Sequence, residues 1–80
     1  SAKSLLQEWT QRYRGMKPTY QLVGTTGPPH DQRFRVAVND DGATLGVGSG
    51  SSRQRAEEQA ARAALIELPD VPDDTVLPVS

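Results

Sequence analysis

The sequence predicts an α+β domain in which two helices pack on one face of a three-stranded antiparallel sheet, in the order α-β-β-β-α. Three observations indicate this fold. Apolar residues recur at helical spacing in two separate segments, the segments between them alternate apolar and polar residues, and the pair Asp41-Gly42 marks a tight hairpin. An antiparallel sheet with one apolar face needs a cover, and each expected helix has one apolar face. We therefore expect a two-layer domain over residues 1–68.

The composition allows one small domain and excludes several classes of protein. The 80 residues include no cysteine and carry a net charge of −1, with all nine Lys and Arg in residues 1–68. Lack of cysteine excludes disulfides and zinc knuckles and fits a reducing compartment, so we expect a cytoplasmic protein. We expect neither a membrane partner nor a signal peptide, because no apolar run is long enough. Residues 69–80 hold three prolines and three acids and are expected to be a disordered tail.

The first expected helix, residues 3–14, carries two stripes at helical spacing. The apolar stripe consists of Leu5, Leu6, Trp9 and Tyr13, and the polar stripe of Ser4, Gln7, Glu8 and Gln11. A solvated surface is the ordinary interpretation of such a polar stripe. Its mostly uncharged donors and acceptors also suit the 2′-hydroxyls and base edges of an RNA minor groove.

Three strands are expected at Thr19 to Thr26, Arg33 to Asn39 and Ala43 to Gly48. Their inward-facing residues are expected to be Tyr20, Leu22, Phe34, Val36, Val38, Leu45 and Val47, and their outward-facing ones Arg33, Arg35 and Ala37. Asp40 and Asp41 fall in the hairpin, where adjacent side chains point apart, so we expect a turn and no metal site.

The loop from Gly27 to Gln32 joins the first two strands and contains two prolines and the only histidine, His30. A lone loop histidine is ordinarily just solvated. The functional alternative for His30 is a donor to a sugar or base in a groove. No other acid, base or nucleophile is spaced to support a catalytic role.

The second expected helix begins after Ser52, which suits the N-cap position, and ends near Leu68. Arg53 and Arg55 lie in its first turn, where the helix dipole disfavours cations unless an anion is bound. Alanines dominate the apolar face, so this helix can approach its neighbour closely. The complete expected core is Leu5, Trp9, Tyr20, Leu22, Phe34, Val36, Val38, Ala56, Ala60, Ala64, Leu65 and Leu68.

Three segments, in order, resemble a known family. GSGSSRQRAEEQAARAAL resembles the C-terminal signature of the double-stranded-RNA-binding domain, Gly-x-Gly-x-Ser-Lys-Lys-x-Ala followed by paired alanines. Lys3-Ser4-Leu5-Leu6-Gln7-Glu8 is similar to the start of that family's first helix, and Gly27-Pro28-Pro29-His30 to its Gly-Pro-x-His loop. The resemblance spans residues 3–68 and is greatest to bacterial ribonuclease III.

The resemblance implies a site that reads duplex shape over about 16 base pairs. It implies contacts to one minor groove from Ser4, Gln7, Glu8 and Gln11, to a second minor groove from Pro28 and His30, and to the intervening phosphates from Ser52, Arg53, Gln54 and Arg55. Gln54 stands where the family has a second lysine, and Asp31-Gln32 stand where basic residues are common. We therefore expect weak binding with a shallow salt dependence.

The resemblance further implies a parent enzyme, ribonuclease III, a magnesium-dependent endonuclease of structured RNA such as ribosomal RNA that is homodimeric through a separate nuclease domain. These residues contain no carboxylate cluster for a metal pair, so we expect a non-catalytic fragment with no cofactor, metal or small-molecule substrate. The alternative is a protein-interaction or dimerisation module with weak or no RNA binding. A dinucleotide site at Gly46-x-Gly48-x-Gly50 is rejected because the spacing is not G-x-G-x-x-G.

Overall fold

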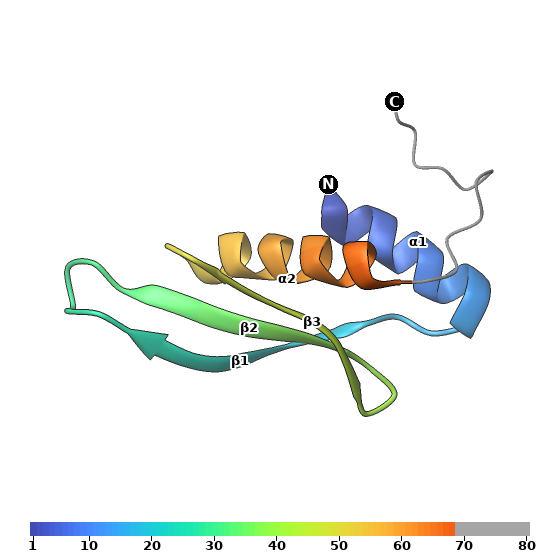
Figure 1. Ribbon diagram of the computed structural model, residues 1–80, viewed down its shortest axis with the longest axis horizontal. Helices are drawn as coiled ribbons and strands as arrows, with labels where there is room; N and C mark the ends of the chain where they lie inside the picture. The colour runs from blue at the N-terminus through green and yellow to red at the C-terminus, as the bar shows by residue number, and fades with distance from the viewer. Residues whose placement is uncertain (69–80) are drawn as a thin grey trace.

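Two layers, one of helices and one of strands, make up the computed structural model, which describes residues 1–68 (Figure 1). The elements are α1 (Ala2–Arg14), β1 (Thr19–Thr26), β2 (Arg33–Asp40), β3 (Ala43–Gly50) and α2 (Arg53–Glu67). The strands form one antiparallel sheet in the order β1-β2-β3, and both helices lie over the same face of it (Figure 1). The predicted fold is confirmed. The predicted tail, residues 69–80, lies outside the described residues.

The helix ends follow local capping chemistry. The Ser52 hydroxyl accepts a hydrogen bond from the backbone N–H of Arg55 at 3.1 Å, so the predicted N-cap of α2 is confirmed. Ser1 caps α1 in the same way, through the amide of Ser4. At the other end of α1, Gly15 adopts the left-handed conformation with φ 68°, which glycine enters without steric cost.

Helix α2 lies directly on the backbone of β3. A Cβ built on Gly46 would come within 2.6 Å of the backbone of α2, one on Gly50 would come within 2.8 Å, and one on Gly48 would overlap the backbone nitrogen of Ala60. Ala56, Ala60 and Ala64 supply the facing side of α2, and all three are fully buried. The close approach predicted from the alanines is therefore matched by glycines that leave it room.

The predicted inward position of Val47 is wrong. The register changes between Val38 and Asn39, so that β3 has one extra residue at Leu45. This bulge breaks the strict alternation of the strand. Leu45 packs against the core, whereas Val47 pairs with Ala37 on the opposite face and is 37% exposed.

Two further predictions about burial are wrong. Leu22, expected in the core, is 39% exposed, because β1 is an edge strand and α2 packs mainly over β3 and β2. Leu5, also expected in the core, is only half-buried and lies outside the core cluster. Ala37 does face outward as predicted, although it is only 7% exposed because it sits in the central strand between Gln21 and Val47. The buried core is otherwise centred on Leu6, Trp9, Val36, Val38 and the α2 alanines, with Tyr20, Phe34, Leu65 and Leu68 packed against its edge.

Candidate nucleic-acid interface

The three segments that the sequence singles out are spread along the longest dimension of the molecule, which measures 44 Å. Figure 1 shows α1 towards one end, the β1–β2 loop at the other end, and the N-terminal end of α2 between them. Ser52 is half-buried in its capping role. The other nine predicted contact residues are exposed: Ser4, Gln7, Glu8, Gln11, Pro28, His30, Arg53, Gln54 and Arg55. Their roles in binding stay predictions.

The polar stripe of α1 faces solvent because the opposite side of the helix is buried. Leu6 is fully buried and Trp9 is 6% exposed, so the residues on the other side of the helical wheel point away from the core. The four stripe residues occupy about two turns, and three of them are uncharged at neutral pH. This surface can offer hydrogen bonds to hydroxyls without attracting phosphates strongly.

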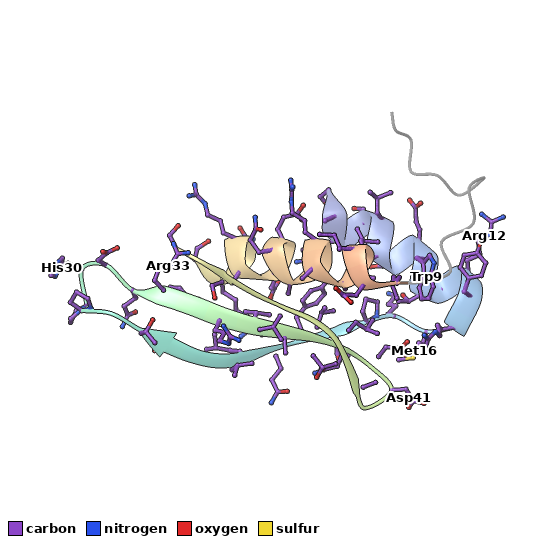
Figure 2. All side chains as sticks on the ribbon, viewed as in Figure 1. Trp9, Arg12, Met16, His30, Arg33 and Asp41 are labelled. Carbon is purple, nitrogen blue, oxygen red and sulfur yellow. The ribbon has the colours of Figure 1, made fainter. Side chains whose placement is uncertain are left out.

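The β1–β2 loop is shaped by its own backbone. The amide of Asp31 donates to the carbonyl of Pro28 at 2.9 Å, and Gly27 has φ 92°. A side chain at Gly27 would meet the carbonyl oxygen of Asp31, so glycine is required there for both reasons. Figure 2 shows His30 at the outer end of this loop, beyond the helical layer. The loop therefore presents His30 as a projecting, exposed donor.

At the start of α2 the two arginines differ in their surroundings. The Nε of Arg53 donates to the Glu57 carboxylate at 3.1 Å, and its guanidinium also reaches the backbone oxygen of Tyr20 at 3.4 Å. Arg55 makes a 3.3 Å hydrogen bond to the hydroxyl of Ser51 and has no ion-pair partner within residues 1–68. Arg55 is therefore the more available cation for a phosphate.

Two glutamates of α2 join it to α1, and the sequence analysis missed both. Glu58 accepts hydrogen bonds from the backbone amides of Ala2 at 2.7 Å and Lys3 at 3.3 Å. Glu57 forms an ion pair with Lys3 as well as with Arg53. The spacing of Arg53 and Glu57, four residues apart on one helix, could have suggested the local pair. The contacts to α1 join residues more than fifty positions apart and leave no local signal.

These contacts change the acidity of the groups involved. Backbone hydrogen bonding from Ala2 lowers the pKa of Glu58 below its ordinary value, against a smaller opposing effect of burial. Burial raises the pKa of Glu57, but hydrogen bonds from Lys3 and Arg53 outweigh it and the net shift is downward. Burial, with the two glutamate charges nearby, raises the pKa of Tyr20 to about 12. Both carboxylates are therefore ionised at neutral pH and hold α1 against α2.

Residues 1–68 contain neither a metal-binding cluster nor a membrane-spanning helix. This part of the chain has no group of three or more His, Cys, Asp or Glu side chains placed to hold a metal ion. Neither α1 nor α2 has the length and apolar character needed to cross a membrane.

The chain is similar to known proteins along most of its length. The family described as "Double-stranded RNA binding motif" matches residues 2–68. A ribonuclease 3 of Geobacter metallireducens is 46% identical over 63 residues, which cover 79% of this chain and 26% of that protein. A ribonuclease 3 of Dechloromonas aromatica is 47% identical over 68 residues, covering 84% of this chain and 31% of that protein. The chain thus spans about a quarter to a third of these curated relatives.

Solved structures agree with this similarity. A structure of Arabidopsis HYL1, described for its implications in miRNA processing, superposes with a TM-score of 0.71 at 38% identity and covers 86% of this chain and 97% of that chain. The first double-stranded-RNA-binding domain of HYL1 gives a TM-score of 0.62, also at 38% identity, over 78% of this chain and 87% of that one. The fold, the order of the three exposed segments and the match over residues 2–68 lead to one conclusion: this chain belongs to the double-stranded RNA binding motif family.

Proposed function

We propose that residues 1–68 bind double-stranded RNA by its shape, with α1 and the β1–β2 loop in successive minor grooves and the start of α2 at the phosphates between them. The observation that carries this proposal is the spread of three exposed segments, each matching the family, along the long dimension of the molecule (Figure 1). A-form RNA offers 2′-hydroxyls and base edges in its wide minor groove and phosphates across the intervening major groove. The elongated shape of the domain suits a ligand that is contacted at several successive grooves along its axis.

The chemistry of each segment supports its role. The α1 stripe of Ser4, Gln7, Glu8 and Gln11 offers mainly neutral groups, which suit hydroxyls. His30 projects from a loop closed by the hydrogen bond from the Asp31 amide to the Pro28 carbonyl, where an imidazole can donate to a sugar or base. The α2 N-terminus combines the helix dipole with the exposed Arg55 guanidinium, and both favour a phosphate.

We further propose that the chain is the RNA-binding part of a bacterial ribonuclease III. Two ribonuclease 3 proteins, of which this chain spans 26% and 31%, support this assignment. In this proposal the magnesium-dependent cleavage and homodimerisation belong to a nuclease domain outside these residues, and the protein acts in the cytoplasm. This fragment then binds RNA without cleaving it.

The test compares duplex RNA of about 20 base pairs with matched duplex DNA and single-stranded RNA, using fluorescence anisotropy with the 80-residue chain. We expect saturable binding to duplex RNA only, because the other two ligands lack paired 2′-hydroxyl-lined minor grooves. The RNA should remain intact after incubation with magnesium. The double substitution Arg53→Ala, Arg55→Ala should weaken binding, whereas Arg62→Ala, an exposed cation further along α2, should change it little.

Equal affinity for RNA and DNA would contradict shape reading through the 2′-hydroxyls. Unchanged RNA binding in the double variant would contradict the phosphate role of α2. Absence of RNA binding by the unaltered chain would favour the interaction-module alternative, and magnesium-dependent cleavage by it would overturn the non-catalytic assignment.

A further inference from the structure

A hollow of about 420 Å³ lies where the end of β3, the start of β2 and the first turns of α2 meet. The residues that line it include Arg33, Ser49, Ser51, Arg55 and Glu58. Figure 2 shows Arg33 between the loop that carries His30 and the N-terminal end of α2. Two arginines from different elements therefore share one hollow, between two segments that the proposed function places on RNA.

The charge in this hollow is positive. Neither Arg33 nor Arg55 has a carboxylate within ion-pair distance in the part of the chain that the structure describes. The only acidic side chain in the lining is Glu58, and its two carboxylate oxygens accept the amides of Ala2 and Lys3. Those bonds direct its charge towards the start of α1. The serine hydroxyls add donors beside the guanidinium groups.

The other arginine in the first turn of α2, Arg53, already has hydrogen-bond partners within the protein. Arg53 is held by Glu57 and by the backbone of Tyr20, and the next residue, Gln54, is neutral. A phosphate approaching the start of α2 therefore meets Arg55 as the available cation of this helical turn. Arg33 supplies a second cation from the sheet, on the side of the hollow nearer the His30 loop.

We infer that Arg33 is a phosphate-contacting residue that shares one RNA phosphate with Arg55 in this hollow. The inference rests on the proposed function and extends it to a residue of β2. Guanidinium groups bind phosphate oxygens with paired, charge-assisted hydrogen bonds, and two of them can hold one phosphate from two sides. The contact gives affinity and position along the duplex, without sequence preference.

The experiment measures the affinity for a duplex RNA of about 20 base pairs at several salt concentrations. Variants are Arg33→Ala, Arg33→Lys, Arg55→Ala, the Arg33→Ala, Arg55→Ala pair, and Arg35→Ala. Arg35 is the matched control, because it is an exposed cation on the same strand that does not line the hollow. Circular dichroism establishes that each variant is folded.

Arg33→Ala should weaken binding roughly tenfold at about 0.1 M salt and reduce the slope of log affinity against log salt by less than one, because Arg55 still contacts the shared phosphate, whereas the double variant should reduce the slope by about one. Arg33→Lys should keep most of the slope, and Arg35→Ala should change affinity less than about threefold. The double variant should lose less than the product of the two single losses, because both residues serve one phosphate.

Binding by the unaltered chain together with an Arg33→Ala variant that behaves like Arg35→Ala would overturn this inference and leave the proposed function standing. Strictly additive losses would show that the two arginines contact different phosphates and would overturn the shared site. No binding by the unaltered chain would overturn both proposals.

Discussion

The Glu58 carboxylate of α2 accepts a hydrogen bond from the backbone amide of Ala2 at 2.7 Å, so one helix caps the start of the other. The first amides of a helix have no partner within it, and an anion there also complements the helix dipole. Because α1 carries the polar stripe and α2 begins with the arginines, this contact fixes the relative placement of two of the three proposed RNA-binding segments.

Replacing Glu58 by alanine should destabilise the domain. The substitution leaves the Ala2 and Lys3 amides without their charged partner, and we expect a loss of about 1–2 kcal/mol in the free energy of unfolding. Urea unfolding followed by the fluorescence of Trp9, the only tryptophan, measures this. The control Glu67→Ala, at an exposed glutamate of the same helix, should differ from the unaltered chain by less than about 0.5 kcal/mol. Equal losses in the two variants would contradict the capping role.

Stability should fall on acidification. The pKa values of Glu57 and Glu58 are lowered in the folded state from the ordinary 4.5, so the unfolded chain binds protons more readily. Their contribution is therefore fully present above the ordinary pKa and is lost as the pH falls through the lowered folded values. Urea midpoints between pH 7 and pH 3 test this. The double variant Glu57→Gln, Glu58→Gln should show a flatter profile, and an equally steep one would assign the loss to other groups.

Gly48→Ala should prevent or strongly weaken folding, because the new methyl group would overlap the backbone of Ala60. Backbone cannot move aside as a flexible side chain can, so we expect a loss of at least about 3 kcal/mol. Gly24→Ala is the matched control, since a Cβ there meets nothing within 4 Å. Thermal unfolding by circular dichroism compares the two variants. Similar melting temperatures would mean that α2 can shift off β3.

Arg14→Ala should destabilise the domain because it removes the ion-pair partner of Asp40. Asp40 is 2% exposed, and its carboxylate lies 3.2 Å from the Arg14 guanidinium in an ion pair. Asp40 is buried but Arg14 is half-exposed, so removing Arg14 leaves the Asp40 carboxylate without its cation, and we expect a loss of about 1–3 kcal/mol in the free energy of unfolding. Asp40→Asn in the Arg14→Ala background should restore part of this, because the buried charge is gone. Chemical denaturation of the unaltered chain, of Arg14→Ala and of the double variant provides the measurement. A further loss of stability in the double variant would contradict the ion pair.

The unaltered chain should bind duplex RNA with a shallow salt dependence. The proposed contact surface offers only Arg33, Arg53 and Arg55 to phosphates, and Arg53 is engaged by Glu57. With Arg33 and Arg55 on one shared phosphate, about one or two neutralised phosphates correspond to a slope of roughly −1 to −2 in log affinity against log salt. Anisotropy titrations from about 50 to 200 mM salt give the slope. A value much steeper than this would mean that further cations reach the backbone.

Local patterns predicted the order and type of all five elements, and the cap at Ser52, because these follow from side-chain periodicity and short-range hydrogen bonding. The faces of β1 and β3 were partly mispredicted. A bulge at Leu45 moves Val47 to the open face, and the position of Leu22 on an edge strand leaves it uncovered. Neither effect has a signature in a few neighbouring residues.

In the candidate site, too, local features were predictable from the sequence and contacts between distant elements were not. Exposure of the α1 stripe, of His30 and of the α2 arginines was predictable from spacing and turn chemistry. The contact of Arg53 with the backbone of Tyr20, the cap from Glu58 to Ala2, and the shared hollow of Arg33 and Arg55 depend on contacts between distant elements. Predicting such contacts requires knowledge of how the helices cross the sheet.

The glycine-to-alanine seam between β3 and α2 has a consequence for how this protein can vary. In most cores a larger side chain on one element is accommodated by a smaller one opposite. Gly46, Gly48 and Gly50 have no side chain that could be made smaller, and the alanines of α2 that face them have only one methyl group each. A larger side chain on either β3 or α2 therefore cannot be compensated by a smaller one opposite. Redesign of this domain should keep these glycines and alanines unchanged and vary the exposed helix surfaces and the β1–β2 loop.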